Sequence, residues 1–121
     1  MRFLATVLLV AWANLALADA TAQLNSLIED HWAWYLEQSP ESKTYRGDHS
    51  ANDRWDNWGL EGLASAYSKQ GEFLARLEDI DSGELSEDGE LNYLLFGRML
   101  RQNRQSYELG LDYMTMNMRD G

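Results

Sequence analysis

Apolar and polar positions along the chain recur with a helical period over much of its length. Between residues 20 and 37 the apolar side is formed by Leu24, Leu27, Ile28, His31, Trp34 and Tyr35, with acidic residues on the other side. This spacing predicts an amphipathic helix. Ser39, Pro40 and Glu41 then predict a new, short helix with Ser39 as its N-cap. It is expected to end near Arg46, because Gly47 can adopt the left-handed conformation that follows many helices.

The second half of the chain predicts two longer helices. Residues 60–80 carry one apolar stripe, with a glycine on the same side that would allow a close helix crossing: Leu63, Tyr67, Gly71, Leu74 and Leu77. Residues 81–83 should break this helix, and Ser86 should cap the next one, whose acidic start and arginine-rich later turns suit the helix dipole. Its apolar side is predicted to use Leu91, Leu94, Leu95 and Met99. Residues 111–121 lack a helical period and are expected to be extended.

These elements predict an all-α fold of antiparallel helical hairpins or a bundle. The first eighteen residues stand apart from it. A basic start at Arg2, an apolar run and the small residues Ala16 and Ala18 are typical of a signal peptide that is cleaved after Ala18. The run is shorter than the roughly 20 residues of a membrane span, and Asn14 interrupts it. We therefore expect an exported chain, periplasmic or extracellular, that is not an integral membrane protein once the signal is removed.

Charge and cysteine content narrow the classes of partner. Without residues 1–18, nine basic and twenty acidic side chains remain, for a formal charge of −11. Such a chain would be repelled by phosphate backbones, which argues against nucleic-acid binding. The sequence has no cysteine, so an exported domain of this kind has to be held together by packing or by a partner and not by disulfides.

The segment between the second and third predicted helices concentrates charged residues. A structural connector, or the rim of a cleft, could be formed by Arg46, Gly47, Asp48, His49, Asp53, Arg54 and Asp56. A metal site is the alternative, but the only histidines, His31 and His49, lie in no metal-binding spacing, and the acids do not follow the EF-hand pattern. The Arg-Gly-Asp triplet could suggest adhesion, yet a helix-capping role already accounts for its glycine. We therefore predict an ion-paired connector without a metal or other cofactor, and we expect His31 to be a hydrogen-bonded histidine of the core or of an interface.

Tryptophans cluster in the same half of the chain and could form a partner surface for peptides or glycans: Trp32, Trp34, Trp55 and Trp58. Trp32 and Trp34 are two positions apart, so both cannot face one core, and one of them should face another element. Nucleophilic catalysis has no evident residues, because there is no cysteine and no serine in a G-x-S-x-G turn. No catalytic residue is predicted.

The order of several short segments resembles the amino-terminal part of the bacterial domain of unknown function 885 family. The segments are DHWAWYLEQSPE at 30–41, GDH at 47–49, NDRWD at 52–56, LEDID at 77–81, LSED at 85–88, LNYLLF at 91–96 and NMRDG at 117–121. The resemblance covers about residues 24–121, and its strength lies in the ordered series, since no single segment is diagnostic. The positions that match recurrent residues of the family are Trp32, Trp34, Ser39, Pro40, Gly47, Asp48, His49, Asp53, Arg54, Asn92, Asp120 and Gly121.

Members of that family are large, mainly helical proteins that are grouped with zinc metallopeptidases because a H-E-x-x-H helix lies far downstream. The resemblance therefore implies that residues 19–121 are the amino-terminal fragment of such a domain. This chain contains no H-E-x-x-H segment, so zinc is implied only for a full-length relative and no hydrolysis is expected of the chain alone. The expected partner is the missing carboxy-terminal remainder.

Two alternatives of other classes stay open. One is a small exported helical binding module for peptides or glycans, which would fold by itself and use the tryptophans. The other is a helical interaction protein of the cell envelope, which would expose one apolar face to its partner.

Overall fold

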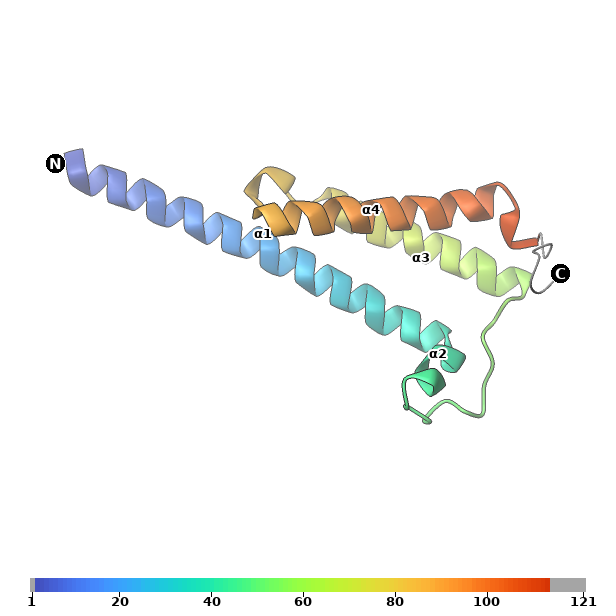
Figure 1. Cartoon of the computed structure of the whole chain (residues 1–121). Helices are drawn as coiled ribbons and strands as arrows, with labels where there is room; N and C mark the ends of the chain where they lie inside the picture. Colours follow the sequence, from blue (N-terminus) through green and yellow to red (C-terminus); the bar gives the residue numbers. More distant parts are fainter. Residues whose placement is uncertain (1, 114–121) are drawn as a thin grey trace.

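The structure, a computed structural model, describes residues 2–113 and the side chains of residues 19–113. It consists of α1 (Arg2–Gln38), α2 (Pro40–Tyr45), α3 (Leu60–Glu78), the 3-10 helix η1 (Ser82–Glu84), α4 (Glu87–Glu108) and the 3-10 helix η2 (Leu111–Tyr113). Figure 1 shows α3 and α4 side by side, with α1 crossing beside them. No strand occurs in residues 2–113, which confirms the predicted all-α fold.

α3 and α4 form an antiparallel hairpin. The hydroxyl of Tyr67 near the start of α3 bonds Glu108 at the end of α4, and near the other end of the pair Leu77 lies against Gly97. A Cβ at Gly97 would lie 3.1 Å from Leu77 Cδ2, so the glycine permits the close approach of the two helices. The pair shares more contacts than any other two elements of the described fold, which makes it the most closely packed unit.

α1 packs across this hairpin through one stripe of side chains. Ala20, Leu24 and Leu27 recur at spacings of three and four and are buried, as the sequence pattern predicts. They join a single apolar core with residues of the hairpin and its turn, namely Phe73, Leu77, Ile80, Leu85, Phe96 and Leu100. At the edge of this core Arg76 donates to Asp30 across 2.6 Å, and both side chains are half exposed.

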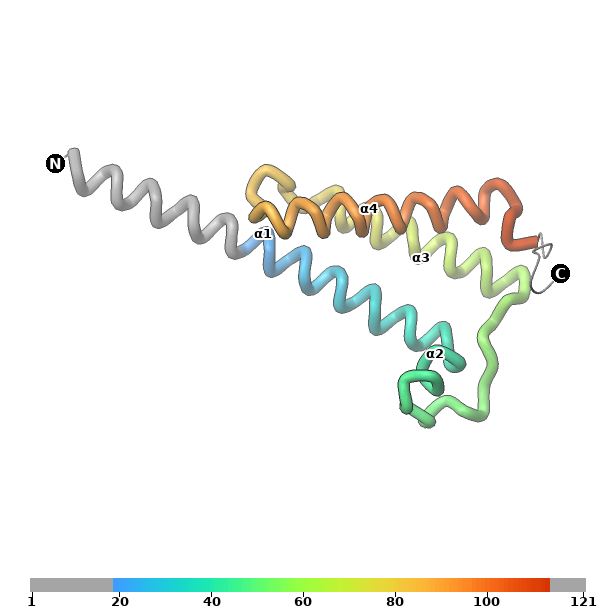
Figure 2. The backbone as a smooth tube through the Cα atoms, viewed as in Figure 1, coloured from blue at the N-terminus to red at the C-terminus, as the bar shows by residue number. Residues whose placement is uncertain are grey.

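The core covers only part of α1. Figure 2 shows α1 lying close to the hairpin in the region of η1 and moving away from it toward α2. The last core contacts of α1 are made by His31 and Trp34, whose rings meet Phe73. Beyond this aromatic layer the helices separate, and residues 46–59 span the gap between α2 and α3.

The predicted helix ends are largely confirmed. Gly47 has a φ of 88°, its N–H donates to Thr44, and the N–H of Asp48 donates to Lys43. These two bonds are the Schellman pattern that closes a helix. Ser86 caps α4 by accepting from the N–H of Gly89 at 3.2 Å. η1 occupies the expected break after α3.

Two expectations are wrong. Leu91, Leu94 and Leu95 do not face the core, because they are 56–58% exposed, and α4 instead buries Phe96, Gly97 and Leu100. The helix carries two apolar stripes. The stripe with Phe96 and Leu100 packs against α3 because Gly97, which has no side chain, allows a close approach there. Residues 111–113 form η2 and are not extended. Residues 114–121, for which the same expectation was made, lie outside the described residues.

Candidate functional site

A large hollow lies where α1 leaves the hairpin. We call it the aromatic cleft. It has a volume of about 880 Å³ and is open on one side. Its walls come from α1 and α2 on one side and from α3 and α4 on the other, and Asp112 of η2 lies at one end. The cleft therefore follows directly from the divergence of α1, and its floor is the aromatic layer where the core ends.

His31 lies in this floor. Its imidazole is 8% exposed and meets Phe73 and Phe96 edge to face at ring-centre distances of 5.0 and 5.2 Å, with Trp34 at 5.5 Å. Burial lowers the pKa of His31 below its ordinary value, and this effect outweighs the neighbouring Gln70 amide, which raises it. The histidine is therefore neutral at pH 7. The core position predicted for it is confirmed, but its Nε2 has no hydrogen-bond partner among the described residues.

Gln70 is the second polar side chain in the floor. It lies on the buried face of α3, one turn before Phe73, and is 8% exposed. Its Oε1 also lacks a hydrogen-bond partner among residues 19–113. Buried polar atoms are usually paired, because an unpaired group loses its bonds to water without compensation. Both side chains line the cleft, and the Gln70 amide acts on the pKa of His31, so these two buried polar groups are neighbours whose unpaired atoms are closed to the open space of the cleft.

The α1 wall of the cleft is aromatic and partly exposed. Trp32 is 41% exposed and stacks on Tyr35 with ring centres 5.5 Å apart. The Arg46 guanidinium lies 4.5 Å from the centre of the Trp32 ring, in cation–π contact. Trp34 packs against the core. The prediction that Trp32 and Trp34 face different surroundings is thereby confirmed.

A cluster of paired side chains joins α3 and α4 beside the opening. Arg104 donates to the backbone oxygen and to the hydroxyl of Tyr67, each at 2.8 Å, and its guanidinium lies 3.9 Å from the centre of the Tyr67 ring. The Tyr67 hydroxyl donates to Glu108 at 2.8 Å, which raises the pKa of Tyr67. Tyr67 and Tyr107 stack with ring centres 4.6 Å apart, and both line the cleft.

Gly71 makes this arrangement possible. A Cβ there would lie 2.5 Å from Arg104 Nη1, so only a glycine leaves room for the guanidinium across α3. The sequence predicted a close helix crossing at this glycine, whereas the group that approaches it is the Arg104 side chain.

The connector folds back on the start of α2 through Asp56. One carboxylate oxygen accepts from the Ser39 hydroxyl at 2.6 Å, and the other accepts from the Glu41 N–H at 3.2 Å. Ser39 occupies the N-cap position, but its hydroxyl bonds the Ser42 hydroxyl at 2.9 Å and accepts from no backbone N–H of the helix. Asp56, seventeen residues after Ser39, therefore accepts the hydrogen bond of a backbone N–H at the start of α2, the role that was predicted for Ser39.

The other connector residues are placed as follows. Arg46 and Asp56 line the cleft, whereas Gly47, Asp48, His49, Asp53 and Arg54 do not. Ser50 lowers the pKa of Asp48, first through its side-chain hydroxyl and then through its N–H, which donates to the carboxylate at 3.0 Å. Arg54 is within 3.8 Å of the adjacent Asp53, and both are largely exposed. Ala51 is 1% exposed and anchors the loop.

The remaining tryptophans are exposed and differ in position. Trp58 is 73% exposed and lines the cleft, whereas Trp55 is 83% exposed and is not part of its lining. The four tryptophans of the predicted partner surface are thus distributed over three environments: the cleft wall, the core edge and the connector.

Sequence reasoning missed Gln70, Phe73 and Phe96 as parts of this site. A three- and four-residue spacing does relate Gln70 to Phe73 and Leu77, but glutamine is polar and was left out of the stripe. Phe96 belongs to the second apolar stripe of α4, which was missed because the leucine stripe was assigned to the core.

Metal-binding groups were sought separately. In the part of the chain that the structure describes, no three or more histidine or acidic side chains gather in a way that could hold a metal ion. The searched residues also contain no helix with both the length and the apolarity to cross a bilayer.

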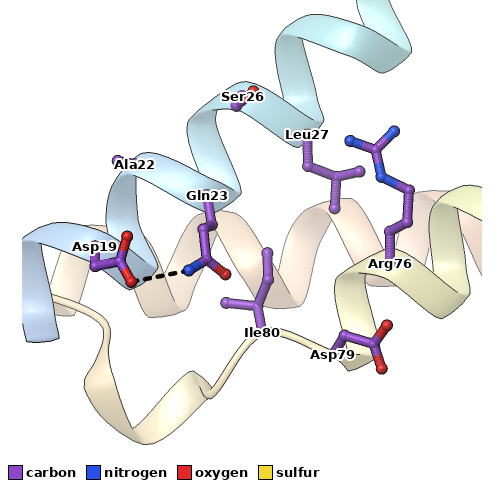
Figure 3. Close-up of a pocket in the computed structure, with 8 residues that line it drawn as sticks. All are labelled: Asp19, Ala22, Gln23, Ser26, Leu27, Arg76, Asp79 and Ile80. Atoms are coloured by element: carbon purple, nitrogen blue, oxygen red, sulfur yellow. Dashed lines mark hydrogen bonds between the residues drawn. The ribbon is translucent and has the colours of Figure 1, made fainter.

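A second hollow, of about 440 Å³, lies between α1 and the end of α3, and Figure 3 shows its lining residues. Gln23 donates to Asp19 at 3.1 Å on α1, while Arg76 and Asp79 project from the other wall. It is shallower and more open than the aromatic cleft, and neither unsatisfied buried atom is in its lining.

Comparisons of the chain with protein-family models, with curated proteins and with solved structures found no match in any of the three. The functional argument therefore rests on the residues and on their geometry.

Proposed function

We propose that the chain is the amino-terminal helical part of a larger exported protein similar to zinc metallopeptidases, and that its own role is structural. The supporting observation is that α4 is apolar on two opposite sides. One side packs into the core through Phe96 and Leu100, and the other exposes Leu91, Leu94 and Leu95. Exposed apolar side chains on a helix that already packs into a core through its other side are typical of a contact with a further protein segment.

In this proposal the hydrolytic chemistry belongs to the rest of the polypeptide. There a zinc ion would activate a water molecule for attack on a peptide bond. The resemblance to the domain of unknown function 885 family supplies that expectation. The described residues contribute the aromatic cleft and the outer leucines as packing surfaces.

The test combines a genetic and a physical measurement. The DNA downstream of the coding sequence is expected to encode a H-E-x-x-H segment, in frame or after a frameshift. Residues 19–121, expressed alone, are expected to be helical by circular dichroism and to bind an apolar dye. A sharp thermal transition with little dye binding would show a self-sufficient domain and overturn the proposal.

A second candidate function is a peptide-binding module, and the aromatic cleft favours it. The stacked Trp32 and Tyr35 are suited to a peptide with apolar side chains. A self-sufficient domain that binds such peptides without zinc would support this function over the first one.

A further inference from the structure

We propose that the aromatic cleft is a docking site for one amphipathic helix that presents an apolar face to the floor and carries basic residues along its edge. The inference rests on the proposed function for the source of that helix, which we assign to the remainder of the same polypeptide. Beyond the proposed function, it specifies where the rest of the polypeptide binds, that one helix binds there, and which side chains that helix carries.

The shape of the cleft fits a helix. Its α1 wall extends from Ile28 to Gln38, about 15 Å of helix, which is enough to contact nearly three turns of a guest. The opposite wall, made by α3 and α4, presents side chains such as Leu63 and Met99 at helical spacings. Two helical walls that diverge leave a groove into which the ridges of a third helix can pack.

The floor is apolar where a guest would touch it. Its two polar atoms, Gln70 Oε1 and His31 Nε2, have essentially no exposed surface, and the Gln70 amide acts on the neighbouring imidazole. A guest helix is therefore expected to present apolar side chains to this floor, where the rings of Trp34 and Phe96 lie.

The charges around the cleft specify the edge of the guest. Glu41, Asp56 and Asp112 line it, against the single guanidinium of Arg46. Arg46 is already engaged on the Trp32 ring. Lysine or arginine along the guest helix would complement the three carboxylates. A second copy of this chain fits poorly, because its formal charge is −10.

The experiment uses the chain purified from the periplasm of a bacterial host after expression with its own first eighteen residues. The probe is a fluorescein-labelled peptide of eighteen residues, built from leucine and lysine in a helical pattern. Fluorescence anisotropy should show it binding about tenfold more tightly than a leucine and glutamate peptide of identical spacing.

Two variants of α3 locate the site. Ala66 lines the cleft and Ala64 is exposed outside it, so Ala66→Lys and Ala64→Lys change the net charge equally. Ala66→Lys is expected to weaken binding of the lysine peptide about tenfold or more, and Ala64→Lys less than about twofold. Circular dichroism should show equal helix content in both variants.

Three outcomes would overturn the inference: no binding of the lysine peptide, equal binding of both peptide charges, or equal effects of the two lysine substitutions. Loss of binding in Leu94→Lys but not in Ala66→Lys would place the peptide on the outer leucines instead, which also overturns it. A concentration-dependent dimer without peptide would assign the cleft to a second copy. The melting and dye measurements test the proposed function separately, so its failure is distinguishable from failure of this inference.

Discussion

At the scale of single residues, the described chain places its buried polar side chains His31 and Gln70 at the edge of the apolar core. His31 is enclosed by Trp34, Phe73 and Phe96, and none of these rings carries a charge that could stabilise an imidazolium. A histidine in this position behaves as a polar member of an apolar layer. Its titration is therefore linked to the integrity of that layer.

The first prediction concerns the pH dependence that follows from this burial. The folded pKa of His31 is lowered, so between that pKa and the unfolded value of about 6.5 the unfolded chain binds more protons. The free energy of unfolding should therefore fall as pH drops through this window, by at most about 1.4 kcal/mol per pH unit. His31→Phe should lose this part of the slope in urea titrations between pH 7 and pH 5.

His49→Ala is the matched control, because His49 is exposed in the connector, and it should retain the slope. If the wild-type chain instead gained stability relative to His31→Phe as pH fell, the fold would prefer the charged imidazole and the assignment would be wrong.

The second prediction couples Gly71 to Arg104. Alanine at position 71 should stabilise α3 by up to about 1 kcal/mol from helix propensity when Arg104 is replaced by methionine. In the wild-type chain that gain should be offset, because the new Cβ displaces a guanidinium that donates to the Tyr67 backbone. A double-mutant cycle by chemical denaturation should give a coupling energy above about 0.5 kcal/mol. Additive effects would mean that the two residues do not share this contact.

At the scale of elements, the helices could be predicted closely and their relative positions could not. Periodicity and capping residues located α2, α3 and α4 to within a few residues, since Pro40, Gly47 and Ser86 act through local backbone chemistry. The choice between the two apolar stripes of α4 depends on the fit of Gly97 against Leu77, a tertiary contact. For the same reason the Asp56 cap and the cleft itself have no local signal in the sequence.

The third prediction tests the end of α2. Gly47→Ala should destabilise the α2 region by about 1–2 kcal/mol, because an L-residue at a φ of 88° is strained. Gly47→Asn should cost less, since asparagine tolerates the left-handed region better. Hydrogen exchange of the α2 amides reports the effect, and equal losses in the two variants would indicate that side-chain bulk and not φ is responsible.

At the scale of the whole molecule, α4 lies between two surfaces with apolar side chains, the aromatic cleft and the outer leucines. The outer patch is formed by Leu91, Leu94 and Leu95, which are 56–58% exposed. Contiguous exposed apolar patches on exported chains commonly mark contacts with other protein segments.

The fourth prediction separates these outer leucines from the core. Replacing Leu91, Leu94 and Leu95 together by glutamine should reduce apolar-dye fluorescence while changing the free energy of unfolding by less than about 0.5 kcal/mol per site. Leu100→Ala, at a fully buried position of the same helix, should cost about 2–5 kcal/mol. A large loss of stability in the glutamine variant would show that these leucines pack within the described fold.

The antiparallel pairing of α3 and α4 has a consequence for the order in which the molecule opens. Their contacts are close in sequence and make them the most closely packed pair of described elements, whereas α2 and the connector bury only a few side chains, Ser39, Pro40 and Ala51 among them. Subglobal unfolding should therefore begin at α2 and the connector and reach the hairpin last. Mass-spectrometric deuterium uptake is expected to rise first in peptides covering residues 40–59, so that the cleft widens at its α2 end before the core is lost.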